Sequence, residues 1–266
     1  MLFANNAMQV INTINDLSSY KHVIVTIGSF DGVHCAHQQI LDLLKSTAKK
    51  IDGVSVLISF QPHPRTVIDP DFKFRVINTE KERNNRIEKA GIDFVLNIPF
   101  TKTFASLSYA DFIQFLTNKI NLHTIVLGYN HNFGKNREGN ADLLKKLAKK
   151  YHFQVVEVKQ HIVSSYSISS TLIRKLITQG NVQDANKLLG YPYSVDIRIK
   201  KELVANQEFC ISLRYAIKVF PTEGTFDVKI KSYDAKISIS KDNMVLVFDE
   251  KIKDIAINQT HNIYFI

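Results

Sequence analysis

Two short segments, far apart in the chain, carry residue types that bind phosphate. The first, residues 28–37, reads Gly-Ser-Phe-Asp-Gly-Val-His-Cys-Ala-His and stands between an apolar run and an amphipathic helical pattern. A tight glycine turn before a helix offers an anion backbone N–H groups and the positive end of the helix dipole. His34 and His37 are three residues apart, so on the first helical turn both would face that anion. The segment therefore predicts a phosphate site.

The second segment, residues 168–174, reads Ile-Ser-Ser-Thr-Leu-Ile-Arg. It places the hydroxyl groups of Ser169, Ser170 and Thr171 at the start of another predicted helix, with Arg174 one turn further on. Hydroxyl groups and a guanidinium are common phosphate ligands. We interpret the two segments as the two halves of one nucleotide site.

Strands and helices alternate along the part of the chain that carries these segments. The expected strands are continuous apolar runs at residues 22–27, 54–60, 94–98, 124–128 and 154–158. The expected helices span residues 37–50, 79–90, 108–119, 140–150, 169–179 and 181–189. Such alternation is typical of a doubly wound α/β domain, whose parallel sheet is covered on both faces. Ligands bind these sheets beyond the carboxyl ends of the strands, where four loops of this chain fall: Gly28, Pro62-His63, residues 128–130 and residues 161–171.

The pattern changes after residue 190. Apolar and polar residues now alternate with period two in short stretches at residues 195–200, 226–230, 235–239 and 244–248. This pattern, with little helical signal, is typical of a small all-β barrel or sandwich. We therefore expect a nucleotide-binding domain at residues 1–190 and a small β domain at residues 191–266.

Composition narrows the classes of partner. The chain has 266 residues and a formal net charge of +9, most of the excess lying before residue 187, which suits anionic ligands. No RNA-recognition signature is visible, so we expect no nucleic-acid partner. No apolar run approaches the roughly 20 residues that span a bilayer, and no secretory signal pattern is visible. With Cys35 and Cys210 as its two cysteines, we expect a cytoplasmic protein with no membrane partner.

The first segment is neither a Walker loop nor a dinucleotide fingerprint. It resembles the His-x-Gly-His signature of the nucleotidylyltransferases. Five further motifs follow in an order similar to that of the bacterial bifunctional riboflavin kinase/FAD synthetases: Phe60-Gln61-Pro62-His63-Pro64, Asn78-Thr79-Glu80-Lys81, Gly128-Tyr129-Asn130-His131-Asn132-Phe133-Gly134, Ile168–Arg174 and Leu188-Leu189-Gly190-Tyr191-Pro192-Tyr193. The resemblance covers roughly residues 20–195.

This resemblance implies an FMN adenylyltransferase domain that makes FAD and pyrophosphate from FMN and ATP, with Mg²⁺ entering with ATP and no metal bound by the protein itself. The catalytic residues implied are His34, His37, Ser170 and Arg174. The implied ATP contacts are Gly28, Phe30, Asp31, Gly32, Asn130, Ser169 and Thr171. The implied flavin contacts are Phe60, Pro62, His63 and Phe133. We expect FMN and ATP as the partners and a monomer or weak homo-oligomer.

The chain departs from the family pattern at three places. Ala36 stands where the family has glycine, and Asn130 stands where it has aspartate. The kinase half of the family carries a Gly-rich segment and a Pro-Thr-Ala-Asn motif, whereas here Pro221-Thr222 is followed by Glu223-Gly224. We therefore expect riboflavin kinase activity to be absent. The same departures support an alternative, a catalytically weakened paralogue that binds flavin or adenine nucleotide in a regulatory or scaffolding role.

Simpler structural roles compete with the chemical ones at several of these residues. A histidine pair can bind zinc, but no further ligand is placed by spacing. His63, between two prolines, is as compatible with a rigid loop as with flavin contact. For Asp31 we expect helix capping and turn formation alongside any adenosine contact, and for Thr79 a helix cap.

Overall fold

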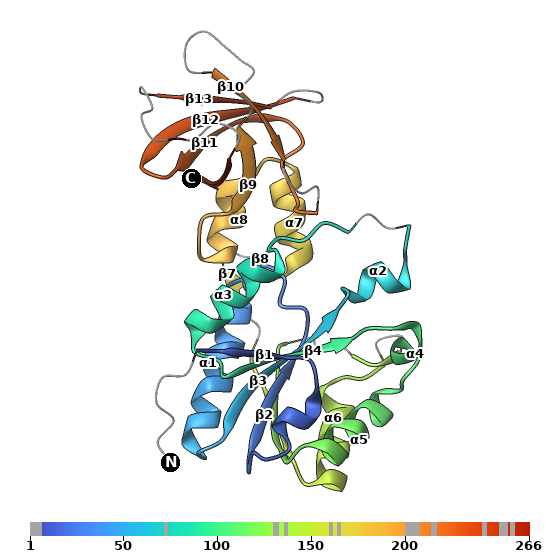
Figure 1. Ribbon diagram of the computed structural model, residues 1–266. Helices are drawn as coiled ribbons and strands as arrows, with labels where there is room; N and C mark the ends of the chain where they lie inside the picture. Colours follow the sequence, from blue (N-terminus) through green and yellow to red (C-terminus); the bar gives the residue numbers. More distant parts are fainter. Residues whose placement is uncertain are drawn as a thin grey trace. The chain divides into compact units, whose positions relative to one another are not determined.

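The computed structural model describes residues 7–71, 74–129, 133–135, 138–159, 162–163, 166–199, 208–213, 217–240, 244–249, 255 and 259–266. Contacts along the chain divide it into two compact units (Figure 1). The first unit comprises residues 1–74 and 80–161, and the second comprises residues 75–79 and 162–266. Each unit is considered by itself.

The first unit is built on a six-stranded parallel sheet with the order β1-β4-β3-β2-β5-β6. Its strands are β1 (Gln9–Ile11), β2 (Val23–Ile27), β3 (Val54–Gln61), β4 (Phe94–Pro99), β5 (Leu122–Leu127) and β6 (Gln154–Glu157). Its helices are η1 (Ile14–Leu17), α1 (Cys35–Lys50), α2 (Pro64–Ile68), α3 (Glu80–Ala90), α4 (Lys102–Ala105), α5 (Tyr109–Lys119) and α6 (Ala141–Tyr151). The predicted doubly wound parallel sheet is confirmed.

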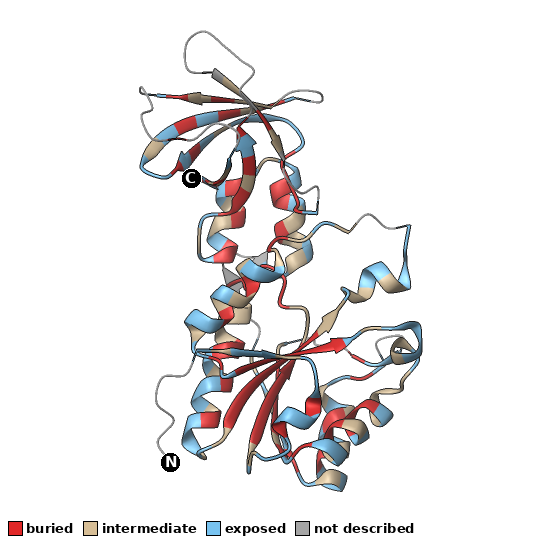
Figure 2. Cartoon of the chain, viewed as in Figure 1, coloured by how far each residue is buried: buried red, intermediate tan, exposed pale blue. Residues whose placement is uncertain are grey.

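Helices cover both faces of this sheet, which is why its four central strands bury side chains on both faces. On one face, Ile24, Leu57 and Val95 share a buried cluster with residues of α1 and α3. On the other face, the intervening strand residues pack with η1, α5 and α6. Figure 2 shows the central strands buried along most of their length. The sheet is therefore a rigid platform for the loops at its carboxyl edge.

The turn after β2 lies at the point where the strand order reverses. From β2, the chain continues through β3 to β4 on one side of the sheet and then returns to β5 on the other side of β2. Crevices at such switch points are the usual ligand sites of open α/β sheets. The predicted phosphate turn, residues 28–34, follows β2 directly and therefore stands at this point.

The second unit is a closed antiparallel barrel with the order β10-β13-β12-β11-β14-β9, together with two helices and a short hairpin. Its elements are β7 (Ile162–Val163), β8 (Tyr166–Ser167), α7 (Ser170–Thr178), α8 (Val182–Leu189), β9 (Ser194–Ile199), β10 (Glu208–Leu213), β11 (Gly224–Ile230), β12 (Tyr233–Ile239), β13 (Met244–Phe248) and β14 (Thr260–Phe265). The predicted small β domain is confirmed as a barrel.

Helices α7 and α8 share one apolar core with the barrel. Ile173, Ile177 and Leu188 belong to the same buried cluster as the inward-facing residues of β9, β11 and β12. Residues 75–79 join this unit through a short bridge, in which the Val76 N–H donates to the Ile217 carbonyl oxygen at 2.7 Å. Contacts thus divide the chain near residue 161, whereas the functional boundary near residue 190 stays a prediction.

Candidate active site

The turn between β2 and α1 has an unusual backbone. Phe30 has φ 49°, Gly32 has φ 89° and Val33 has φ 34°. Glycine adopts positive φ without penalty, but for a β-branched residue such as valine it is a genuine outlier. Strained backbone of this kind persists only where its surroundings hold it, and it concentrates at binding and catalytic sites.

Hydrogen bonds hold this turn in place from three directions. The Gly28 N–H donates to the Ile58 carbonyl oxygen of β3 at 3.0 Å, and the Val33 N–H donates to the Phe30 carbonyl oxygen at 3.1 Å. From α1, the Gln38 side-chain amide donates to the Val33 carbonyl oxygen at 3.0 Å. The turn is therefore tied to the sheet, to itself and to the helix that follows.

His34 is the N-cap of α1, and its Nδ1 accepts a hydrogen bond from the His37 N–H at 3.3 Å. A neutral imidazole that accepts at Nδ1 carries its proton on Nε2, which is then a hydrogen-bond donor. The expectation that Asp31 caps this helix is wrong, because helical backbone begins at Cys35 and the residue before it is His34. Asp31 is instead buried inside the turn, only 4% exposed.

The two histidines and Phe30 form a stack of three rings. The His34 and His37 ring centroids are 3.6 Å apart with planes 12° apart, and the Phe30 and His37 centroids are 4.4 Å apart with planes 25° apart. Phe30 and His34 are almost fully buried, so the ring between them is held on both faces. The predicted pairing of His34 with His37 beside the start of α1 is therefore present.

One residue that lies against this turn, Arg83, was not predicted from the sequence. Arg83, on α3, is 7% exposed, and its Nη1 donates to the Ser59 hydroxyl at 2.8 Å and to the Ser29 carbonyl oxygen at 3.4 Å. Its Nε and Nη2 both donate to Asn84 Oδ1. Burial lowers the pKa of Arg83, while the charge of the Glu80 and Asp31 carboxylates acts in the opposite direction.

A signal for Arg83 was present in the sequence. It stands four residues before Ile87, which is completely buried, so both residues lie on the face of α3 that meets the sheet. An arginine at a core-facing position of a helix indicates a buried partner.

Aromatic residues gather beyond the carboxyl ends of β3 and β4. The Phe60 ring lies 5.5 Å from Phe100 and 5.6 Å from Phe104, and Phe112 joins the same cluster. Phe133 meets the edge of this group at Phe112, at 6.5 Å. Two of the predicted flavin residues, Phe60 and Phe133, therefore belong to one aromatic cluster, and their contact with flavin stays a prediction.

The other two predicted flavin residues lie where α2 begins. Pro62 follows a cis peptide bond, and His63 is the N-cap of α2, with its Nδ1 accepting from the Arg65 N–H at 3.2 Å. The His63 ring also stacks on Phe74 at 4.0 Å. His63 thus has a structural role in the loop, and flavin contact by Pro62 and His63 stays a prediction.

The second predicted half of the site belongs to the other unit, at the start of α7. Ser169 is the N-cap, and its hydroxyl oxygen accepts from the Leu172 N–H at 3.2 Å. Ser170 and Arg174 are one turn apart on α7, and both are partly buried beside the inward-facing Ile173 and Ile177. The structure thus forms each half by itself. Asn130 lies outside the described residues.

Burial raises the pKa of the Cys35 thiol, outweighing the opposite effect of a hydrogen bond from its own backbone. A raised pKa keeps the side chain as a thiol near neutral pH, which argues against nucleophilic chemistry at this cysteine.

No cluster of three or more His, Cys, Asp or Glu side chains that could hold a metal ion occurs among the described residues. Over the same residues, no helix has the length and apolar character needed to cross a membrane.

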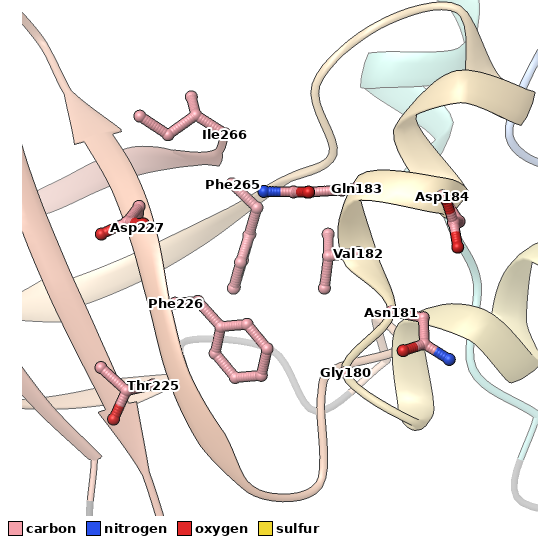
Figure 3. Close-up of a pocket in the computed structure, with 10 residues that line it drawn as sticks. All are labelled: Gly180, Asn181, Val182, Gln183, Asp184, Thr225, Phe226, Asp227, Phe265 and Ile266. Carbon is pink, nitrogen blue, oxygen red and sulfur yellow. The ribbon is translucent and has the colours of Figure 1, made fainter.

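The second unit contains a half-open cavity of about 300 Å³ (Figure 3). The turn between α7 and α8 and the start of α8 form one wall, including Asn181 and Gln183. Phe226 and Phe265 of the barrel form the other. None of the predicted site residues lines this cavity, so it adds nothing to the candidate site.

The chain is similar to several known proteins. The family model described as FAD synthetase matches residues 16–172. A bifunctional riboflavin kinase/FMN adenylyltransferase of Buchnera aphidicola is 31% identical over 246 residues, covering 89% of this chain and 77% of the relative. A FAD synthetase of Listeria monocytogenes is 35% identical over 176 residues, covering 66% of this chain and 71% of the relative.

A solved structure from Streptococcus pneumoniae, titled a macrolide-efflux protein, has the same fold. It superposes with a TM-score of 0.84 at 25% sequence identity, covering 97% of this chain and 89% of that chain. The shared architecture therefore extends over both units, whereas the match to the FAD synthetase family ends shortly after the start of α7.

Proposed function

Because this chain belongs to the FAD synthetase family, we propose that it transfers AMP from ATP to FMN, giving FAD and pyrophosphate. The observation that best supports this proposal is the turn after β2, where a strained backbone at the switch point of the sheet holds the His34–His37 stack beside the start of α1. A turn of this kind suits an anionic, phosphorylated ligand.

The proposed reaction requires little acid or base chemistry. An oxygen of the FMN phosphate attacks the α-phosphorus of ATP, and the bond from that phosphorus to the oxygen bridging to the β-phosphate breaks. Because the nucleophile is already an anionic phosphate, catalysis depends on positioning and on stabilising the charge that develops on the transferred and leaving groups.

The residues of the turn suit this task. The Nε2–H of His34 and the positive end of α1 would stabilise negative oxygens on the transferred phosphate, with His37 beside them. Ser170, Thr171 and Arg174 would hold the β- and γ-phosphates. Mg²⁺ would enter with ATP, bound by phosphate oxygens and water.

The experiment that tests this proposal is product analysis. The purified chain is incubated with FMN and Mg-ATP, and the flavins are separated by chromatography. We expect FAD to accumulate with time and with protein concentration. If no FAD appears above a control without protein, while circular dichroism shows a folded chain and FMN is saturating, the proposed activity is refuted. Retention of FMN or ATP in equilibrium dialysis, without turnover, would instead support the weakened paralogue.

We further propose that riboflavin kinase activity is absent. A kinase holds ATP phosphates and metal close to the accepting hydroxyl, commonly with a glycine-rich loop. From residue 191 onward the single glycine is Gly224. It begins β11 with φ 130°, and a Cβ there would meet the Phe226 ring at 2.8 Å. The backbone conformation of this glycine and its close approach to the Phe226 ring account for its presence without a phosphate-binding loop.

A further inference from the structure

Arg83 is a buried cation that the proposed chemistry leaves unexplained. Removing an arginine from water is costly, and an apolar side chain of similar size can fill such a site without that penalty. At 7% exposure, the guanidinium is instead kept beneath the turn between β2 and α1. Its position therefore calls for an electrostatic or geometric reason.

The first reason is geometric. Arg83 Nη1 joins the Ser29 carbonyl oxygen of the turn to the Ser59 hydroxyl of the neighbouring strand β3. Because the peptide between Ser29 and Phe30 is planar and trans, its N–H points in the direction opposite to this carbonyl. By holding the carbonyl, Arg83 keeps the Phe30 N–H pointing away from the interior, at the residue where φ becomes positive.

The second reason is electrostatic. Asp31 is buried within the same turn, and its carboxylate would repel a polyphosphate that approached it. The Arg83 guanidinium interacts with the Glu80 carboxylate, whose Oε1 lies 3.9 Å from Nη2, and to a smaller extent with the charge of Asp31. A guanidinium stays protonated even when burial lowers its pKa. The buried cation therefore offsets part of the negative charge that Asp31 brings to an anion site.

We propose that Arg83 is a positioning residue of the nucleotide site, which offsets the Asp31 charge and fixes the Ser29–Phe30 peptide so that the turn can accept the phosphates of ATP. This role rests on the proposed function of the turn as the ATP site. Arg83 acts through the turn and has no assigned contact with substrate.

The test is a double-mutant cycle that combines Arg83→Met with Asp31→Asn. Two quantities are measured for each variant: the Kd for Mg-ATP, by titration calorimetry, and the KM for ATP. We expect Arg83→Met to weaken Mg-ATP binding by about tenfold or more with a smaller change in kcat. In an Asp31→Asn background we expect the same substitution to cost less than about threefold, because the charge it offsets is gone. Lys89→Met, which removes an exposed cation from the same helix, is the matched control and should leave both values unchanged.

Several outcomes would overturn the proposal. If Arg83→Met weakens Mg-ATP binding equally in the two backgrounds, Arg83 only fixes the Ser29–Phe30 peptide and does not offset the Asp31 charge. An unchanged KM for ATP in Arg83→Met would show that Arg83 does not position the nucleotide site at all. If Arg83→Met does not fold, Ser59→Ala removes the hydroxyl that accepts from Arg83 Nη1 and should raise the KM for ATP by about threefold. If the wild-type chain binds Mg-ATP but forms no FAD, the proposed activity fails while the binding cycle still tests Arg83.

Discussion

Replacing His34 separates its structural role from its proposed chemical role. His34 caps α1 through Nδ1, whereas the proposed charge stabilisation uses Nε2. Loss of an N-cap costs about 1 kcal/mol, which for a chain of this size lowers the melting temperature by about 2–4 °C. Loss of a donor that stabilises the transition state costs about 3–4 kcal/mol, or roughly 10²–10³-fold in turnover. His34→Ala should show both effects.

His34→Asn is the informative companion. The asparagine side-chain oxygen can still accept from the His37 N–H, since asparagine is among the best N-cap residues. Its shorter amide does not replace Nε2–H. We therefore expect His34→Asn to recover most of the melting temperature and to keep the loss of turnover. Initial rates of FAD formation and thermal melts followed by circular dichroism measure the two effects. An active His34→Asn enzyme would show that the residue serves only as a cap and would refute the proposed charge stabilisation.

Three further results are expected. His37→Ala and Arg174→Ala should each slow FAD formation by at least about tenfold, because each removes a proposed phosphate donor; a fully active variant contradicts its assignment. Riboflavin with Mg-ATP should give no FMN beyond a trace, and steady FMN formation by the full chain would show that the barrel is a working kinase. In a Cys210→Ser background, Cys35 should react with iodoacetamide more slowly than free cysteine at pH 8, because its raised pKa lowers the thiolate fraction. Reaction as fast as free cysteine would contradict the raised pKa of that thiol.

The alternation of strands and helices could be predicted because the central strands of the first unit are apolar on both faces. Short elements could not. β1 is three residues long with two exposed side chains, and α4 is four residues long and begins at a cap from Thr101. Such segments carry too few residues for a periodic pattern and form because their neighbours hold them. β14 was missed because His261 and Asn262 interrupt its apolar run, although His261 is buried.

The parts of the candidate site that depend on residue spacing along the chain were predicted, whereas the part that depends on which residues are buried against the sheet was not. The glycines of the turn and the i, i+3 spacing predicted that His34 and His37 lie together at the start of α1, but not that their rings stack. Asp31 was expected to cap α1 because aspartate is a favoured N-cap residue. The N-cap is the residue before the first residue with helical φ and ψ, and in α1 that residue is His34. Arg83 was overlooked because its helix is polar overall, and a single inward-facing cation within it depends on the sheet beneath.

The bridge at residues 75–79 has a consequence for how the chain folds. Val76 pairs with Ile217 and Val219, and the Asn78 side chain accepts from the Tyr191 hydroxyl, so this segment needs partners that are synthesised much later. Ile77 within it is completely buried in the barrel unit. The barrel unit therefore cannot be completed from contiguous sequence. During synthesis, the apolar side chain of Ile77 stays exposed until the residues that bury it have been made. We expect a fragment that stops before the barrel to expose Ile77 and to bind hydrophobic dyes or chaperones more strongly than the full chain.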